Sequence, residues 1–219
     1  MPIAIVGDIH NDTKKMQDID DRLPDDVARV VQVGDIGFYQ RTRQYFNVLK
    51  LKRPWYFIRG NHDDHEYLLQ YNTITEVAPN LFYVPNGTVW EMDGQKVGFL
   101  GGAGSVDAAF NYTWSPLERI TDEEVAKFDN VDHLDFLVTH TPPQETITAW
   151  MNPQDLVNYF GLPIDWKDPS AAKVQQVWEK FGRCRLFAGH LHKSIIDGKV
   201  RILDIDEVYA YYGEINETY

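Results

Sequence analysis

The stretch Ile58-Arg59-Gly60-Asn61-His62-Asp63 decides how the whole chain is interpreted. The apolar run 55–58 is typical of a buried strand, which Gly60 ends. An amide, an imidazole and a carboxylate follow directly. Polar groups placed there face the crevice at the carboxyl edge of an open α/β sheet, where ligands bind. An ordinary turn, in which Asn61 or Asp63 caps a helix 65–71, explains this stretch alone equally well.

The same pattern recurs along the chain. Apolar runs end at residues 7, 34, 139 and 189, and Asp or His follows each of them at once. The polar residues at these ends are Asp8, His10, Asp35, His140, His190 and His192. Independent capping at so many strand ends is a poor explanation. The sequence therefore predicts that these side chains gather at one site.

Strands and helices alternate in the first part of the chain. Strands 3–7, 30–33 and 55–58 are each followed by a helix, at 12–23, 41–51 and 65–71. Such alternation predicts parallel strands with right-handed crossovers.

The rest of the chain has a different pattern, with short strands close together. Strands at 82–84, 88–92 and 96–100 are joined by hairpin signals at 86–87 and 93–94. A helix at 121–128, which opens with capping-box spacing, precedes the strand that ends at His140. Another helix, at 170–181, precedes the strand that ends at His190. The tail, 194–196, 200–205 and 208–212, predicts an antiparallel meander. We expect one domain over residues 1–219 with two packed sheets.

Composition excludes several classes of protein. The net charge of −12 argues against a large nucleic-acid surface. No run approaches the roughly 18 apolar residues of a membrane span, and the start has no basic leader, so we expect a cytoplasmic protein without membrane contact. The one cysteine, Cys184, excludes an internal disulfide and begins an apolar strand, which favours a buried thiol.

One basic cluster departs from the acidic average. Its members flank the helix expected after Asp35: Arg41, Arg43, Lys50, Lys52 and Arg53. They form either a solvated helix face, the interpretation we favour, or a nucleic-acid contact.

The polar residues at the strand ends offer oxygen and nitrogen donors without a thiolate. Together with Asn61 they suit two divalent ions of the Mn, Fe, Zn or Co type rather than a closed zinc site. Asp8 with His10, and His190 with His192, have the spacing of two that places side chains on one face of an extended segment. Two dications, two carboxylates and a bridging hydroxide leave the site near +1, which favours a phosphate oxyanion. Paired ions also supply a nucleophile for in-line displacement.

The motifs Asp8-Ile9-His10, Gly34-Asp35, Gly60-Asn61-His62-Asp63, Thr139-His140 and Gly189-His190-Leu191-His192, in this order, resemble the calcineurin-like metallophosphoesterase family. The resemblance implies a four-layer α/β/β/α sandwich of two mixed sheets flanked by helices. By position it implies one metal held by Asp8, His10 and His192. It implies a second held by Asn61, His140 and His190, with Asp35 as the bridge. His62 would protonate the leaving oxygen or stabilise the transition state.

One position departs from the family pattern. Many members carry an aspartate three residues after the bridging one, where it orients the histidine, but this chain has Phe38. Either Asp63 or a water would then orient His62. The segment 101–107, with Trp114 and Glu118, is similar to a subgroup of small bacterial and phage phosphoesterases.

The leading hypothesis is a hydrolase of a small phosphomonoester or phosphodiester, acting through a metal-bridging hydroxide with His62 assisting the leaving group. The two ions are manganese first, with iron, zinc, cobalt or nickel as alternatives. A nuclease with the same chemistry is the second hypothesis, and a non-catalytic scaffold is the third. Every position that would hold a metal ligand carries a residue able to bind metal, which argues against the scaffold.

Other residues have two interpretations each. Arg59 either clamps a phosphate or forms a salt bridge under the site. Asp107 either caps a loop or touches substrate. His65 and His133 lie outside the motifs, and we expect both to face solvent.

Two longer features also remain open. The aromatic residues Tyr39, Phe110, Tyr112 and Trp114 form either a wall for substrate or plain loop packing. The stretch 142–169 is long for a connection, and such loops are often lids or interfaces.

Overall fold

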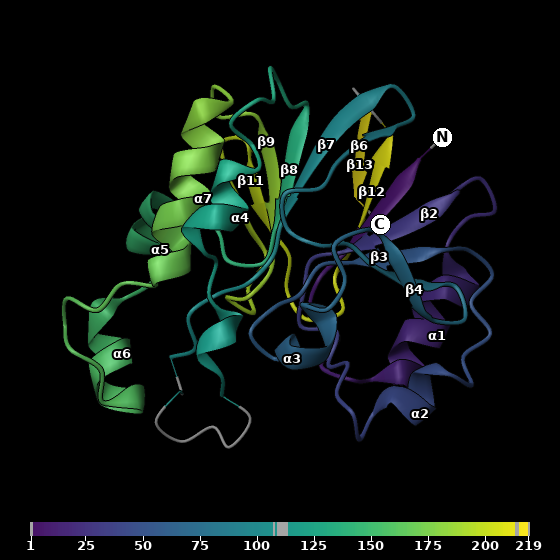
Figure 1. Ribbon diagram of the computed structural model, residues 1–219, viewed down its shortest axis with the longest axis horizontal. Helices are drawn as coiled ribbons and strands as arrows, with labels where there is room; N and C mark the ends of the chain where they lie inside the picture. Colours follow the sequence, from purple (N-terminus) through teal and green to yellow (C-terminus); the bar gives the residue numbers. More distant parts are fainter. Residues whose placement is uncertain (1, 107, 109–113, 213–214, 219) are drawn as a thin grey trace.

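The structure, a computed structural model, describes residues 2–106, 108, 114–212 and 215–218. Two mixed β-sheets pack face to face, and helices cover the outer face of each (Figure 1). The first, seven-stranded sheet has the order β13 (Ile215–Thr218), β12 (Val208–Tyr212), β1 (Ile3–Val6), β2 (Arg29–Gln32), β3 (Trp55–Phe57), β5 (Leu81–Tyr83), β4 (Thr75–Ala78). The second, six-stranded sheet has the order β10 (Ile195–Asp197), β11 (Val200–Ile202), β9 (Arg185–Ala188), β8 (Phe136–Thr139), β7 (Gln95–Leu100), β6 (Val89–Met92).

Parallel strands lie at the centre of both sheets. In the first sheet β1, β2 and β3 are parallel neighbours. In the second sheet β7, β8 and β9 are parallel neighbours. Because the carboxyl ends of parallel strands meet at one edge, each sheet presents its strand-end loops together.

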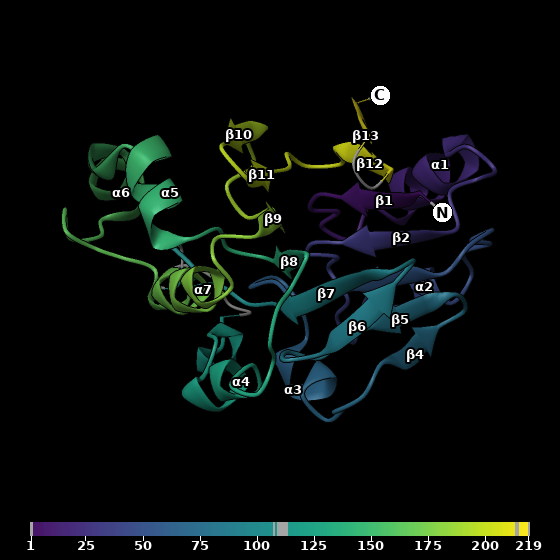
Figure 2. The ribbon, with the colours of Figure 1, turned by 90° about the horizontal axis from the view of Figure 1, so that it is seen from above.

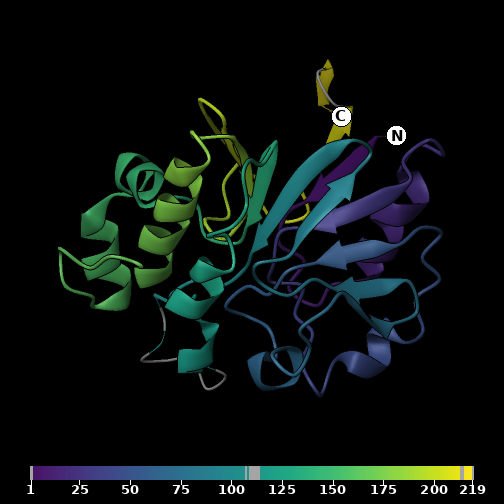
Figure 3. The same ribbon diagram turned by 45° about the horizontal axis from the view of Figure 1, so that its top comes forward.

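Helices form the two outer layers. The first sheet is covered by α1 (Thr13–Arg22), α2 (Arg43–Phe46) and α3 (His65–Leu68). The second sheet is covered by α4 (Asp122–Ala126) and α7 (Pro169–Lys180). A 3-10 turn, η1 (Pro116–Glu118), precedes α4. Two further helices, α5 (Gln144–Trp150) and α6 (Pro153–Phe160), lie at one edge of the molecule, where α5 packs against α7 (Figures 2 and 3).

Alternation along the strands builds three separate hydrophobic layers. In β1, Ala4 packs against α1, whereas Ile3 and Ile5 pack between the sheets. In β8, Leu137 packs against α7 and Val138 packs between the sheets. Strands buried on both faces in this way read as continuous apolar runs. The predicted four-layer sandwich is therefore confirmed.

Several predicted elements differ from the structure. The helix expected at 41–51 is only α2, because side chains of α1 take the following N–H groups: Gln17 accepts from Lys50 and Asp20 accepts from Lys52. The helix expected at 65–71 is shorter, and the capping box of α4 is confirmed. Strands β4 and β13 and helices α5 and α6 were not predicted from the sequence.

The hairpin signals had different outcomes. The turn at 93–94 joins the antiparallel pair β6 and β7, as predicted. The signal at 86–87 joins no hairpin, because Asn86 hydrogen-bonds Gly101 where the chain passes from one sheet to the other. The tail is likewise split: β10 and β11 belong to the second sheet, and β12 pairs with β1 in the first. No helix in the described part of the chain is long and apolar enough to cross a membrane.

Candidate metal centre

The structure brings all the predicted ligand residues to one place. They follow the carboxyl ends of central strands from both sheets: Asp8 and His10 after β1, Asp35 after β2, Asn61 after β3, His140 after β8, and His190 and His192 after β9. The crevice therefore lies where the two sheets meet.

One group of donors surrounds Asp8. Ligand atoms of Asp8, His10, Asp35 and His192 all lie within 4.8 Å of one another. The Nε2 atoms of His10 and His192 are 2.9 Å apart. The His192 Nε2 is 3.2 Å from Asp8 Oδ2. Two carboxylates and two imidazoles thus converge on one point.

A second group surrounds His140. Its Nε2 lies 3.0 Å from Asn61 Oδ1 and 3.3 Å from Asp35 Oδ1. Its ring centroid is 5.0 Å from that of His190. The other ring nitrogen, Nδ1, is 2.9 Å from the carbonyl oxygen of Val33. That hydrogen bond leaves Nε2 free to coordinate, as second-shell contacts of metal-binding histidines do.

Asp35 lies between the two groups. Its Oδ1 faces His140, and its Oδ2 is 4.0 Å from the Nε2 of His10. The side chain is 1% exposed, yet Oδ2 accepts no hydrogen bond from the described residues. A buried carboxylate oxygen without a partner is costly, and a cation would satisfy it. The donor set therefore fits divalent transition-metal ions.

The charges of the site reflect burial and close partners. Burial disfavours the charged forms of Asp35 and His140, but their mutual attraction outweighs it, lowering the pKa of Asp35 and raising that of His140 to about 9. Burial lowers the pKa of His190 to about 3 and also lowers that of His10. The hydrogen bond to Asp8 raises the pKa of His192. Neutral His10 and His190 are in the form that binds metals.

The backbone at these residues is strained. Asp35, His10, His190 and His192 all have positive φ, between 47° and 69°. For residues with a Cβ this region costs roughly 1–2 kcal/mol each. Such strain clusters at functional sites, where the surrounding structure imposes it.

Glycines allow the strand ends to approach one another. A Cβ at Gly60 would lie 2.0 Å from Asp35 Oδ1. A Cβ at Gly189 would lie 2.1 Å from Asp8 Oδ1. Gly60, before Asn61, therefore makes room for a carboxylate that follows the neighbouring strand β2, and Gly189, before His190, makes room for one that follows β1 of the other sheet.

Asn61 is oriented by residues whose role the sequence analysis missed. Its amide Nδ2 donates to Ser105 Oγ at 3.1 Å, so its oxygen faces His140. Ser105 in turn donates to Glu118, through Oγ and through its backbone N–H, both at 2.7 Å. Both residues are buried. Their only sequence signal was the family-like segment that contains them.

Two expectations about the loop after β3 need correction, one for His65 and one for Asp63. His65 is 3% exposed rather than solvent-facing, because its ring packs under the loop with Nε2 3.2 Å from the Asn61 carbonyl oxygen. Phe38 is fully buried and packs against Phe46. Asp63 bonds backbone N–H groups and does not orient His62. Within the described residues no carboxylate hydrogen-bonds the His62 ring, which lies beside His10 with the centroids 5.5 Å apart.

Arg59 forms a salt bridge with Glu124 under the site and does not act as a phosphate clamp. Its guanidinium bonds both oxygens of Glu124, at 2.9 and 2.8 Å. It also donates to the carbonyls of Leu117 and Glu118. It is 1% exposed. Arg59 thereby fastens the segment that carries Glu118 beneath the metal-ligand loop.

The basic cluster is largely neutralised. Arg43 pairs with Asp64, and Lys52 pairs with Asp21 at 2.8 Å. Arg53 is buried and donates to the carbonyl oxygens of Pro24 and Val27. The favoured interpretation of a solvated helix face holds for part of the cluster only, because Arg43 alone lies in α2 and Arg53 is buried.

The remaining expectations have mixed outcomes. His133 is exposed, as expected, and Cys184 is buried. Trp114 donates its indole N–H to Glu118 at 3.2 Å. Asp107, Phe110 and Tyr112 lie outside the described residues.

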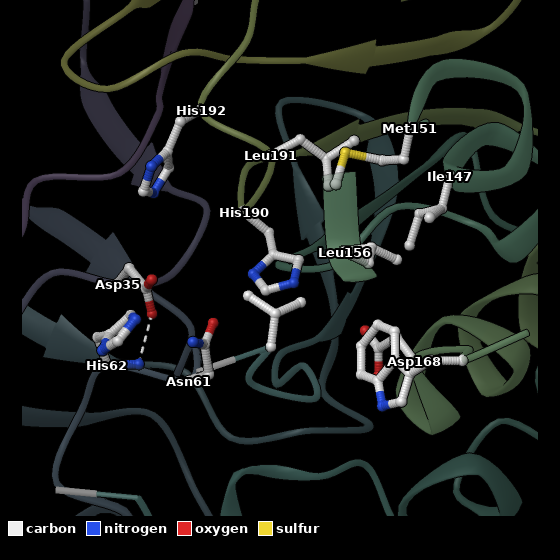
Figure 4. A pocket seen from close by; sticks show the side chains of 12 residues that line it. Asp35, Asn61, His62, Ile147, Met151, Leu156, Asp168, His190, Leu191 and His192 are labelled. Carbon is white, nitrogen blue, oxygen red and sulfur yellow. Dashed lines mark hydrogen bonds between the residues drawn. The ribbon is translucent and has the colours of Figure 1, made fainter. Parts of the chain in front are cut away.

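A cavity of about 290 Å³ opens on the donors (Figure 4). Its lining residues are Asp35, Asn61, His62, Val106, Ile147, Met151, Leu156, Trp166, Asp168, His190, Leu191 and His192. The stretch 142–169, expected to be a lid or an interface, thus supplies one wall of the cavity.

The family model of the calcineurin-like phosphoesterases matches residues 1–194. The chain belongs to this family and is a hydrolase of phosphoric esters, as the sequence predicted. One solved structure, of an archaeal phosphodiesterase, matches 100% of this chain and 98% of that chain, with 13% identity and a TM-score of 0.46. No curated protein matches the chain.

Proposed function

We propose that this protein is a dinuclear metal-dependent phosphoesterase that hydrolyses a small phosphomonoester or phosphodiester. The observation that carries the proposal is the position of Asp35. One of its oxygens faces His140 and the other faces His10, so a single buried carboxylate is shared by two groups of donors.

Each group of donors suits one ion. Asp8, His10 and His192 would hold the first, with Asp35 between the two. Asn61, His140 and His190 would hold the second. The donors are imidazole and oxygen groups, which suit manganese, iron, zinc, cobalt or nickel. When bound, such a pair of ions neutralises phosphoryl charge and lowers the pKa of a water to about 7.

His62 is proposed as the residue that assists the leaving oxygen. Its backbone N–H donates to Asp35 Oδ1 at 2.7 Å, which fixes its position relative to the donors (Figure 4). Its ring lines the cavity and is half-buried. A positioned imidazole can deliver a proton to an ester oxygen as the bond breaks.

The two other hypotheses receive less support. A nuclease needs cationic groups along a backbone track, but the cavity lining contains no lysine or arginine among the described residues. A scaffold that lost catalysis would have no reason to keep strained backbone at four donor positions.

The test uses protein loaded in turn with Mn, Fe, Co, Ni and Zn. We expect hydrolysis of p-nitrophenyl phosphate or bis-p-nitrophenyl phosphate, with two metal ions bound per chain. Binding of a single ion would remove the dinuclear assignment. Tight binding of two ions without hydrolysis of either ester would remove the catalytic one.

A further inference from the structure

The cavity beside the donors has two unlike halves. Figure 4 shows Asp35, His62 and Asn61 on one side and Ile147, Met151 and Leu156 on the other. The second half is formed by apolar side chains of α5, α6 and the loops near them, which we name the apolar compartment: Ile147, Met151, Leu156, Trp166 and Leu191.

Helix α6 contributes one buried side chain to the apolar compartment. Leu156 is 6% exposed, whereas Tyr159, three residues further on the same helix, is 77% exposed. Helix α6 therefore turns one apolar side chain into the cavity and leaves another in solvent. A substrate group that fills the compartment would contact Leu156 and be removed from water itself.

The compartment contains no counter-charge for an anion. None of the described lining residues is a lysine or an arginine. The sequence 107–113, next to the lining residue Val106, has none either. Arg59 is directed at Glu124 and at backbone carbonyls. Asp168 adds an acidic side chain to the same wall.

These features bear on the charge of the substrate. A phosphomonoester carries about −1.5 to −2 at pH 7, as phosphorylated side chains do. A phosphodiester carries a single charge and an additional organic group. With the phosphate at the donors, the single negative charge of a diester matches a site that two dications, two carboxylates and a hydroxide leave near +1. The second organic group of the diester gains from contact with the apolar walls.

We propose that the substrate is a phosphodiester and that one of its two ester groups is an apolar or aromatic group seated in the apolar compartment. The proposal rests on the proposed phosphoesterase function, because the phosphate is placed at the donors. A cavity of about 290 Å³ lies at the lower end of ligand pockets, which suits one compact group.

The first experiment measures binding without turnover. Methyl phenyl phosphate, dimethyl phosphate and phenyl phosphate are titrated against manganese-loaded His62→Ala protein, in which turnover should be slow, with affinities read by calorimetry. We expect methyl phenyl phosphate to bind at least about 10-fold more tightly than dimethyl phosphate, since a lost apolar contact in a pocket costs this much or more. It should also bind more tightly than the monoester. Equal affinity of the two diesters, or preference for the monoester, would overturn the proposal.

The second experiment tests the compartment itself. Met151→Ala and Leu156→Ala should weaken the binding of methyl phenyl phosphate and leave the affinity for dimethyl phosphate unchanged. The matched control is Tyr159→Ala, on the same helix but exposed. If Leu156→Ala unfolds α6, the Met151→Ala result alone tests the compartment. Met151 is the C-cap residue of α5, outside α6, and is half-buried. An effect of Tyr159→Ala equal to that of Met151→Ala would contradict the assignment.

Hydrolysis separates this inference from the proposed function. For bis-p-nitrophenyl phosphate, kcat/KM should fall in Met151→Ala and stay unchanged in Tyr159→Ala. If Met151→Ala hydrolyses bis-p-nitrophenyl phosphate as well as the unchanged protein does, the phosphoesterase function remains supported and the role of the apolar compartment is rejected. Selective binding of the phenyl diester without turnover of any ester would do the reverse.

Discussion

Asp63 holds Asp35 from behind: the Oδ2 atom of Asp63 accepts the backbone N–H of Asp35 at 3.1 Å. The same carboxylate accepts N–H groups from Gly60 at 2.7 Å, Gly37 at 2.9 Å and Phe38 at 3.1 Å. The loops after β2 and β3 are thereby joined by one buried side chain. Asp63 is thus a structural brace for the site and not a partner of His62.

Asp63→Asn should destabilise the protein and weaken metal binding together. An amide offers one acceptor and turns its NH₂ group toward N–H donors, which leaves buried groups unsatisfied at about 1–3 kcal/mol. We expect a lower free energy of unfolding in urea and weaker manganese binding by calorimetry. Asp64→Asn is the control, because an asparagine keeps the N-cap of α3. Metal affinity unchanged in Asp63→Asn would show that the brace does not position the donors.

The hydrogen bonds from Glu118 through Ser105 to Asn61 give the second prediction. Ser105→Ala removes the acceptor of the Asn61 amide, so the amide oxygen is no longer held toward His140. Changes behind a metal ligand cost about 10-fold in affinity or more. We expect weaker binding of one of the two ions and little change for the other. Ser115→Ala, at the N-cap of η1, serves as the control. Equal weakening of both ions would contradict a specific role for Asn61.

The donors were predictable because each carries a local mark. Each is an Asp, Asn or His at the end of a strand, after a glycine in most cases and after Thr139 in the case of His140, and parallel strands bring such ends to one edge. Asp35 and Asn61 are examples on neighbouring strands, and the glycines before them are explained by the close approach of the loops.

The supporting residues were not predictable in this way. Glu118 lies 57 residues after Asn61 in the chain, and it reaches the site only because Arg59 ties down its backbone. His65 reads as a surface residue of a short helix, and only tertiary packing buries it. Helix α6 has apolar residues at helical spacing, Leu156, Val157 and Phe160, but with only eight residues the pattern is too short to stand out from the surrounding loop.

Cys184 should be unreactive in the folded protein. Burial raises the pKa of its thiol to about 11, from an ordinary value near 9. At pH 8 the thiolate fraction is then about one in a thousand, and the thiolate is the reactive form. We expect slow labelling by a disulfide reagent at pH 8, faster labelling as the pH rises toward 11, and fast labelling at pH 8 in guanidinium. Fast labelling of folded protein at pH 8 would show that the thiol is accessible.

Substitution of His140 should remove bound metal and turnover, whereas substitution of His62 should lower turnover alone. His140 is fully buried between Asp35 and Asn61, so His140→Ala removes a donor from the site. We expect it to lose bound metal and turnover together, as Asp35→Asn should. The His62 ring has no such partners among the described residues and lies beside His10. His62→Ala should therefore keep near-normal metal content while turnover falls by about 100-fold or more, the usual contribution of a general acid. Metal content by elemental analysis, measured beside kcat, separates the two roles. Loss of metal from His62→Ala would make His62 a ligand, and full turnover in His140→Ala would remove His140 from the donor set.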